Sequence, residues 1–515
     1  MLVKINGSAV YGVDAIPITI ETSWTNAGKD NVIVGLPDSA VKESLQRVES
    51  AVKTNGFDMP RTRVVFNLAP ADIRKSGTAF DLPIAIGLLA ATGQIQEPER
   101  LSHYVIMGEL SLDGEVRAIK GALPIAIEAR KRGMKGLIVP ATNSREAAMV
   151  NQLNVYGVSS LLEVVDFFNK QEQGLEPLIV NTRDEFFESQ YDFEIDFAEV
   201  KGQEHIKRAL EITAAGGHNA ILIGPPGAGK TMLAKRLPTI LPPLTLQEAL
   251  ETTKVHSVAG KLPDHATLIA RRPFRSPHHT VSDVALVGGG SIPQPGEISL
   301  AHNGVLFLDE LPEFKRTVLE VMRQPLEERK VTISRASNTA EFPASFMLIA
   351  SMNPCPCGYY NHPERECTCP PGGVQKYLNR ISGPLLDRID LHVEVTPVNF
   401  EEIASQRKQE TSAAIRERVI AARELQAARF KNNADIYANA QMTNKLLQEI
   451  CVIDKVGQNL LKIAMQKLNL SARAYDRILK VSRTIADLSN SPTIRPEHLA
   501  EAIQFRSLDR ESVKM

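Results

Sequence analysis

The stretch AILIGPPGAGKTMLAKRL constrains the fold of this chain more than any other part of its sequence. Four apolar residues, Ala220–Ile223, lead into Gly224–Thr231, and a helical pattern follows. The loop matches G-x-x-x-x-G-K-[ST], whose backbone N–H groups and following helix N-terminus bind phosphates. An ordinary glycine turn before a helix is the alternative, and the full match disfavours it. The sequence therefore predicts an α/β unit with a nucleotide phosphate site.

Each part of this loop has an expected role in binding ATP. Lys230 is expected to bridge the β- and γ-phosphates as a point charge, and the Thr231 hydroxyl to bind Mg²⁺. The glycines let backbone N–H groups close around the β-phosphate. The residues of this segment expected to contact the nucleotide are Gly224, Pro225, Pro226, Gly227, Ala228, Gly229, Lys230, Thr231 and Met232.

Two further strand ends carry polar groups that suit ATP hydrolysis. The apolar run Val305–Leu308 ends in Asp309 and Glu310. Asp309 is expected to hold Mg²⁺ through water, and Glu310 to polarise the attacking water. The run FMLIASMN ends in Asn353, whose amide is expected to orient that water, with a simple strand-terminating turn as the alternative.

Length and composition set the broader class. At 515 residues the chain is too long for one core, and about three domains are expected. The formal net charge is −1, so any nucleic-acid contact requires a local concentration of positive charge. The longest apolar stretch, LPIAIGLLAATG, is too short to span a bilayer, and no signal-peptide core precedes it. A cytoplasmic protein without membrane contact is expected.

The pattern along the chain divides it into four parts. The first part alternates β-like runs with helical patterns, and the second is acidic and irregular. A second α/β unit follows, and the last part is helical almost throughout. The expected parts are an α+β domain at 1–170, a linker at 171–195, the ATP-binding core at 196–397 and a helical lid at 398–515.

The order of these motifs resembles that of the AAA+ ATPases. The resemblance implies that DFAEVKGQEHIKRALEIT borders the adenine, with Val200, Gly202 and Gln203 near the base. It also implies that Asn353 is the residue called sensor 1, which contacts the γ-phosphate side of the site.

The same resemblance assigns roles to arginines. Arg388, in SGPLLDRIDLHVEV, takes the place of the arginine finger, and Arg473 takes the place of sensor 2. A finger acts on the γ-phosphate of a neighbouring subunit, so it implies a ring, most often a hexamer. Arg380 is a second candidate for that contact. The alternatives are a local pair of Arg388 with Asp387 or Asp390, and a solvated helix charge at Arg473.

The segment between the strand ends narrows the resemblance. RPFRSPHHTVSDVALVGGGSIPQPGEISLAHNGVLFLDELPEF is similar to the magnesium-chelatase-like branch of AAA+ proteins, which includes MCM-type helicases. That branch implies an insert around 280–294 and a β-hairpin within 329–342. Lys330 and Arg335 of the hairpin are then expected to enter the ring pore and contact DNA. A surface hairpin with two solvated cations is the alternative.

The first domain resembles the proteolytic domain of Lon proteases, on the segments VVFNLAPADIRKSGTAFDLPIAIGLLAA and MGELSLDGEVRAIKGALPIAIEARKRGMKGLIVP. That domain uses a Ser–Lys dyad, but the serine place holds Ala79 and the lysine place holds Leu123. Neither side chain can act as a nucleophile or base. Ser76 and Lys120 lie nearby in sequence but not in those places. An inactive scaffold for assembly or substrate binding is expected.

Together the parts resemble the ComM/YifB family over nearly the whole chain. The resemblance implies a hexameric, ATP-driven DNA helicase that promotes branch migration in homologous recombination and natural transformation, acting on single-stranded and branched DNA. Two alternatives do not act on DNA: a chelatase-type ATPase that drives metal insertion into a tetrapyrrole, and a protein-remodelling ATPase or protease. The Lon-like domain argues against the first alternative, and Ala79 argues against proteolysis.

Four of the five cysteines lie in one loop, 354–370, directly after Asn353. Four thiolates suit a tetrahedral structural Zn²⁺, which would hold together a loop without an apolar core. The spacing is C-x-C rather than the usual C-x₂-C, and His362 could replace one thiolate. Unliganded thiols and a redox disulfide remain alternatives. The expected zinc ligands are Cys355, Cys357, Cys367 and Cys369.

Overall fold

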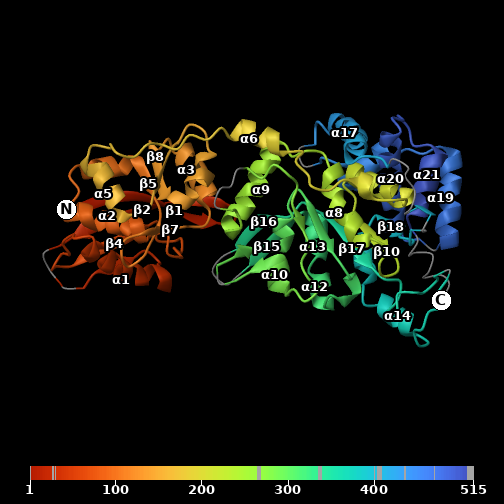
Figure 1. The fold of residues 1–515 in the computed structure, drawn as a ribbon, viewed down its shortest axis with the longest axis horizontal. Helices are drawn as coiled ribbons and strands as arrows, with labels where there is room; N and C mark the ends of the chain where they lie inside the picture. The colour runs from red at the N-terminus through yellow and green to blue at the C-terminus, as the bar shows by residue number, and fades with distance from the viewer. Residues whose placement is uncertain are drawn as a thin grey trace.

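The computed structural model shows an elongated molecule, with an N-terminal sheet domain at one end and a helical region at the other (Figure 1). An α/β core with the phosphate loop lies between them. The residues that the structure describes are 2–25, 28, 30–263, 268–290, 292–334, 339–362, 364–398, 401–402, 409–433, 436–468 and 470–506.

The N-terminal domain is built on a seven-stranded mixed sheet in the order β3-β4-β2-β1-β5-β8-β9. Its strands are β1 (Leu2–Tyr11), β2 (Asp14–Trp24), β3 (Val32–Val34), β4 (Val64–Ala69), β5 (Tyr104–Ile106), β8 (Gly136–Pro140) and β9 (Asn154–Val158). A small hairpin joins β6 (Glu109–Leu110) to β7 (Val116–Arg117). The helices are α1 (Ser39–Thr54), α2 (Asp81–Ala91), η1 (Pro98–His103), α3 (Ala122–Lys131), α4 (Ala141–Ala148) and α5 (Leu161–Asn169).

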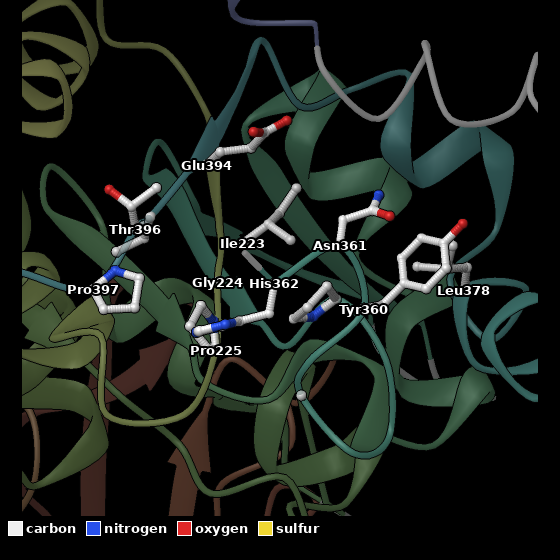
Figure 2. Close-up of a pocket in the computed structure, with 13 residues that line it drawn as sticks. Ile223, Gly224, Pro225, Tyr360, Asn361, His362, Leu378, Glu394, Thr396 and Pro397 are labelled. Atoms are coloured by element: carbon white, nitrogen blue, oxygen red, sulfur yellow. The ribbon is translucent and has the colours of Figure 1, made fainter. Parts of the chain in front are cut away.

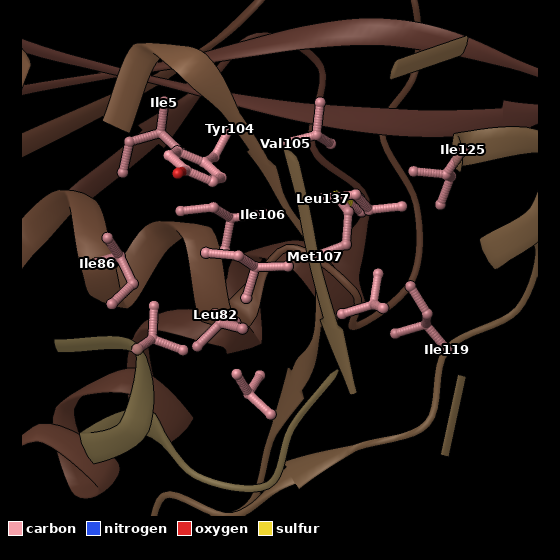
Figure 3. Close-up of a cluster of buried hydrophobic side chains, with 14 of the residues drawn as sticks. Ile5, Leu82, Ile86, Tyr104, Val105, Ile106, Met107, Ile119, Ile125 and Leu137 are labelled. Carbon is pink, nitrogen blue, oxygen red and sulfur yellow. The ribbon is translucent and has the colours of Figure 1, made fainter. Parts of the chain in front are cut away.

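The apolar stretch at 82–91, too short for a membrane span, forms the central helix α2 of this domain. Every residue of α2 is buried, and Leu82 and Ile86 pack with Ile5 and Ile106 of the sheet (Figure 3). Its one carboxylate, Asp81, is neutralised by Arg47 at 2.6 Å, which makes the burial of that charge tolerable. Among the described residues no helix is both long and apolar enough to cross a membrane.

The central core is a five-stranded parallel sheet in the order β11-β14-β17-β10-β18. Its strands are β10 (Ala220–Ile223), β11 (Phe274–Arg275), β14 (Val305–Leu308), β17 (Met347–Met352) and β18 (Leu391–Glu394). Because the strands are parallel, the polar residues that follow β10, β14 and β17 meet at one edge of the sheet. That edge is where parallel α/β sheets bind ligands.

Helices and two hairpins surround this sheet. The helical segments are η2 (Phe197–Glu199), α7 (Glu204–Gly216), α8 (Lys230–Ile240), α9 (Leu246–Ala259), α10 (Asp283–Val287), α11 (Glu297–Leu300), η3 (Leu311–Glu313), α12 (Arg316–Glu320), α13 (Arg323–Glu328), α14 (Gly373–Leu378) and α15 (Gly383–Leu386). One hairpin pairs β12 (Gly288–Gly289) with β13 (Gln294–Pro295), and the other pairs β15 (Lys330–Ser334) with β16 (Thr339–Pro343). The β12–β13 hairpin lies where the resemblance implied an insert, and the β15–β16 hairpin lies where it implied a hairpin.

The C-terminal region is helical, as its sequence pattern predicts. Its helices are α17 (Ser412–Arg429), η4 (Asn439–Gln441), α18 (Asn444–Ile450), α19 (Lys455–Leu468), α20 (Ala472–Leu488) and α21 (Pro496–Gln504). Helices α17 and α20 pack on α7, and their buried side chains share one apolar cluster with β10 and β18. The segment expected as an irregular linker differs from that expectation, because it contains the helix α6 (Thr182–Ser189), which buries Phe186.

The N-terminal domain contacts the core through polar groups at one boundary. Lys254 of α9 pairs with Asp14 at 2.6 Å, and the Tyr11 hydroxyl donates to the Thr339 carbonyl of β16 at 2.7 Å. The buried Ser257 hydroxyl donates to the Glu146 carboxylate, which also accepts from the backbone N–H of Leu123. The N-terminal domain and the core are therefore joined beside Leu123, the position that corresponds to the catalytic lysine of Lon proteases.

Candidate nucleotide-binding site

The phosphate loop has the backbone that its glycines predict. Gly227 and Gly229 have φ of 79° and 84°, the left-handed region that favours glycine. A Cβ atom on Gly224 would lie 2.2 Å from the Val395 carbonyl oxygen. Gly229 then begins α8, so the loop runs directly into a helix N-terminus, an arrangement that binds phosphate.

Lys230 lies at the centre of the site and is largely buried. Its Nζ atom donates to the carbonyl oxygens of Gly224 at 2.7 Å and Pro225 at 2.9 Å, and to Asn353 Oδ1 at 3.1 Å. Burial lowers the pKa of Lys230, while the carboxylates of Asp309 and Glu310 oppose that shift. The structure thus brings the loop lysine and the polar end of β17 into direct contact.

The expected magnesium ligands are also together. Thr231 Oγ1 donates to Asp309 Oδ2 at 2.7 Å, and the Ser351 hydroxyl donates to the other oxygen, Oδ1. Hydroxyl and carboxylate oxygens are the donors that Mg²⁺ prefers, so these side chains fit that ion. Ser351 was not singled out from the sequence, although its place two residues before Asn353 on the same strand would have indicated it.

Glu310 is held at the mouth of the site in an unusual backbone conformation. Its φ is 54°, and its side chain is 57% exposed. Its Oε2 atom lies 3.6 Å from His279 Nδ1, a residue that the sequence argument did not identify. The signal that could have found His279 is the His-His pair in RSPHH, because histidine is a common proton donor and acceptor at functional sites.

The residues expected beside adenine lie next to the phosphate loop. Gln203 Nε2 donates to the Ala228 carbonyl at 3.0 Å, and a Cβ on Gly202 would meet the Glu402 carboxylate at 2.6 Å. Val200 is 1% exposed and belongs to the apolar core under the sheet. Gln203 therefore borders the loop, whereas Gly202 lies against Glu402 and Val200 is part of the apolar core. Met232, on the first turn of α8, is exposed.

The side chain of Arg388, expected in the place of the arginine finger, is buried within this chain. Its side chain is 7% exposed, pairs with Glu327 at 2.5 Å and donates to the Pro384 carbonyl at 2.6 Å. Within this chain the partner of the guanidinium is Glu327, rather than Asp387 or Asp390, which the sequence offered as local alternatives. The local partner of Arg388 depends on the burial of its side chain, which could not be predicted from the sequence.

The other two arginines are more accessible. Arg380 is 52% exposed and pairs with Glu313 of η3 at 2.9 Å, one helix away from the Glu310 strand end. Arg473, at the start of α20, is exposed and lies 3.5 Å from Asp387. Of the two arginines proposed for a contact between subunits, Arg380 and Arg388, Arg380 is the more exposed.

The hairpin expected in the ring pore is present as β15 and β16. Lys330 opens β15 and pairs with Glu341 of β16 at 2.9 Å, with both side chains exposed. The pair raises the pKa of Lys330 through its hydrogen bond to Glu341. Arg335, the other residue expected to contact DNA, lies outside the described residues.

The four clustered cysteines form a plausible metal centre by their geometry. The Sγ–Sγ distances are 3.2 Å for Cys355–Cys357, 3.8 Å for Cys355–Cys367 and 3.5 Å for Cys357–Cys367. A tetrahedron with Zn–S bonds of about 2.3 Å has edges of about 3.8 Å, so the sulfurs fit a zinc ion. All four thiols, Cys369 included, are free rather than paired in disulfides and lie within 4.8 Å of one another.

One thiol of the cluster is favoured as a thiolate. The backbone N–H of Tyr359 is the largest cause that lowers the pKa of Cys357, to about 5. A thiolate is the form that binds a metal. His362, the suggested alternative ligand, instead turns toward the phosphate loop and lines a separate pocket (Figure 2).

The Lon-like domain keeps a cavity where a protease would have its dyad. A space of about 440 Å³ is lined by Ala79, Thr78, Glu109 and Lys120, and on the other side by Ile292 of the β12–β13 hairpin. Leu123 is fully buried and is not among the lining residues. Ala79 and Leu123 supply neither a hydroxyl nor an amine in the places that a Ser–Lys dyad requires, whereas Ser76 and Lys120 line the same cavity.

Sequence comparisons match most of the chain. The profile "Magnesium chelatase, subunit ChlI" matches residues 196–403, "Subunit ChlI of Mg-chelatase" matches 20–143, and the ChlI C-terminal profile matches 409–506. Lon protease 2 of Bacillus subtilis is 32% identical over 159 residues, 28% of this chain and 27% of that protein. These matches confirm the predicted fold class, with a Lon-like N-terminal domain, a P-loop AAA+ core and a helical C-terminus.

Two relatives match from end to end. Competence protein ComM of Haemophilus influenzae is 46% identical over 510 residues, 98% of this chain and 97% of that protein. The YifB protein of Salmonella typhimurium is 43% identical over 516 residues, 99% of this chain and 98% of its own. Because these identities extend over nearly the whole of each chain, this protein belongs to the ComM/YifB family of magnesium-chelatase-like AAA+ proteins.

Proposed function

We propose that this protein is an ATP-driven DNA motor, a hexameric helicase that promotes branch migration during homologous recombination, as in natural transformation. Its partners would be single-stranded and branched DNA in the cytoplasm. One observation carries the proposal: Lys230, Asp309 and Asn353 converge on one phosphate loop in a chain that is 46% identical over its full length to a competence protein.

The geometry supports ATP hydrolysis by defined roles. Lys230 is held by the carbonyl oxygens of Gly224 and Pro225, which leaves its ammonium beside the space for the β- and γ-phosphates. Thr231 and Asp309 would hold Mg²⁺, which neutralises phosphate charge when bound. Glu310 would orient the attacking water, with Asn353 on its other side.

Ring formation is supported by an exposed arginine near the reaction edge. Arg380 follows the cysteine loop and is half exposed beside Glu313, so a small rotation of its side chain would present it to a neighbouring phosphate. We therefore assign the contact between subunits to Arg380, and to Arg388 a role in holding α13 through Glu327. Arg473 remains the proposed sensor 2.

DNA contact is assigned to the hairpin of β15 and β16. Lys330 is exposed there, and backbone phosphates would compete with Glu341 for its ammonium. Arg335, five residues later in the sequence, would add a second cation. In this proposal 1–170 is an inactive Lon-like scaffold, 171–195 connects it to the ATPase core at 196–397, and 398–515 forms the lid.

The test is ATP hydrolysis measured with and without single-stranded and forked DNA at low salt, with Lys230→Ala as the inactive control. We expect DNA to stimulate hydrolysis and the wild-type protein to move a branch point in three- and four-strand substrates. Hydrolysis that is indifferent to DNA would refute the motor and favour a chelatase-type or protein-remodelling ATPase.

A further inference from the structure

The cysteine loop packs directly against the phosphate loop. Gly358, inside the loop, is buried, and a Cβ atom on it would lie 2.5 Å from Cδ of Pro226. A pocket of about 150 Å³ separates the two loops farther along, lined by Gly224 and Pro225 on one side and by Tyr360 and His362 on the other (Figure 2). The cysteine loop thus packs against the Gly224–Pro226 side of the phosphate loop.

Both ends of the segment that holds the cysteines are attached at Asn353. Cys355 follows Asn353 by two residues and is fully buried. Tyr377, on α14 beyond the last cysteine, accepts a hydrogen bond from the Asn353 backbone, and burial is the main cause that raises its pKa to about 12. Since the Asn353 side chain contacts Lys230, a shift of this segment would reach the phosphate loop by a second route.

The loop has few means of holding its own shape. Among its described residues only Cys355 and Gly358 are buried. Its side-chain contacts include two at the surface: Arg365 stacks on the Tyr359 ring at 5.1 Å and donates to its hydroxyl, and His362 meets the same ring edge-on. Short-range backbone hydrogen bonds, such as Gly358 N–H to the Cys355 carbonyl, add to them. Four thiolates around one cation would supply the crosslink that an apolar core otherwise provides.

We propose that a thiophilic divalent cation, such as zinc, bound by the four cysteines holds the Pro225–Pro226 half of the phosphate loop in its nucleotide-binding conformation. Metal occupancy then controls nucleotide affinity. This inference rests on the proposed ATP site and deepens it. Loss of the metal allows the cysteine loop to move away from Pro225 and Pro226. A smaller fraction of the protein then has a phosphate loop in the nucleotide-binding conformation, and the apparent affinity falls in proportion to that fraction.

The first experiment compares three preparations of the full chain: zinc-loaded, stripped with a chelator, and stripped then reloaded with zinc. A fluorescent ATP analogue is titrated at equilibrium, metal content is measured, and a thermal unfolding curve shows that the stripped protein is still folded. We expect about one zinc per chain, roughly tenfold weaker binding after stripping, and recovery on reloading. Equal affinity in all three folded preparations would overturn the proposal.

The second experiment disturbs the contact without removing a metal ligand. Gly358→Ala places a methyl group against Pro226, at a backbone φ of 87°. Gly372→Ala is the matched control, because its φ is 74° and nothing lies within 4 Å of the added atom. We expect both variants to retain zinc and only Gly358→Ala to lose nucleotide affinity, by about fivefold or more. Equal affinities for the two variants would count against the contact.

The design separates this inference from the proposed function. If neither zinc-loaded wild-type protein nor the Lys230→Ala variant binds nucleotide, the ATP site itself is refuted. Nucleotide binding that is abolished by Lys230→Ala but insensitive to zinc and to Gly358→Ala would leave the ATP site intact and refute only the coupling. Should Gly358→Ala lose zinc, the stripped and reloaded wild-type preparations decide the question.

Discussion

The Thr231 hydroxyl donates a 2.7 Å hydrogen bond to the Asp309 carboxylate across 78 residues of sequence. The second oxygen of Asp309 accepts from Ser351, on the neighbouring strand. Asp309 is therefore oriented by the first turn of α8 and by the neighbouring strand β17 before any ion binds. Such supporting contacts set how well a side chain holds a metal.

Ser351→Ala should weaken the use of Mg²⁺ without removing a ligand. The change leaves Asp309 free to rotate, so we expect ATP hydrolysis to need a higher Mg²⁺ concentration, by about tenfold. The measurement is the hydrolysis rate as a function of Mg²⁺ at saturating ATP. An unchanged Mg²⁺ requirement in a folded variant would show that Ser351 does not position Asp309.

Lys230→Ala and Glu310→Gln should fail at different steps. Lys230→Ala removes the ammonium that meets the phosphates, so nucleotide binding itself should be lost. Glu310→Gln keeps the binding site but lacks the carboxylate that polarises water, so ATP should remain bound in an assembled ring, with hydrolysis slowed about a hundredfold or more. Bound nucleotide after gel filtration and particle size together test this contrast. Normal hydrolysis by Glu310→Gln would exclude the role assigned to that residue.

Arg380→Ala and Arg388→Ala should separate assembly from stability. Arg388 is buried against Glu327 and the Pro384 carbonyl, so its removal should cost about 1–2 kcal/mol of unfolding free energy. Arg380 is half exposed, so its removal should leave the melting temperature nearly unchanged and slow hydrolysis only in the assembled ring. Thermal unfolding and ATP turnover as a function of protein concentration distinguish the two. A stable Arg388→Ala protein with defective turnover would return the finger role to Arg388.

Ala79→Ser alone should not produce a protease. The new hydroxyl would line the 440 Å³ cavity, but the lysine place holds Leu123, which is fully buried and supplies no base. We expect no release of fluorescent peptides from labelled casein, with or without ATP. Activity in Ala79→Ser that disappears on Lys120→Ala would reveal that the nearby Lys120, which lines the same cavity, serves as the base.

The parts of this protein that depend on local sequence could be read without a structure. The phosphate loop, the strand that ends in Asp309 and the helical C-terminus follow from glycine placement, apolar runs and periodicity, which act over a few residues. Family likeness supplied the Lon-like domain and the β15–β16 hairpin. The helix α6 was not predicted within the expected linker, because the burial of its Phe186 depends on residues distant in sequence.

The sequence by itself determined that this chain carries a P-loop core and that four thiols share one loop, and its resemblance to Lon proteases put Ala79 and Leu123 in the places of the dyad. Only the tertiary structure decided that Arg388 is buried, that His279 and Ser351 join the site, and that Gly358 lies against Pro226. The physical reason is that burial and contact arise where strands distant in sequence meet at one sheet edge. The spacing of residues along the chain does not predict which of them come into contact there.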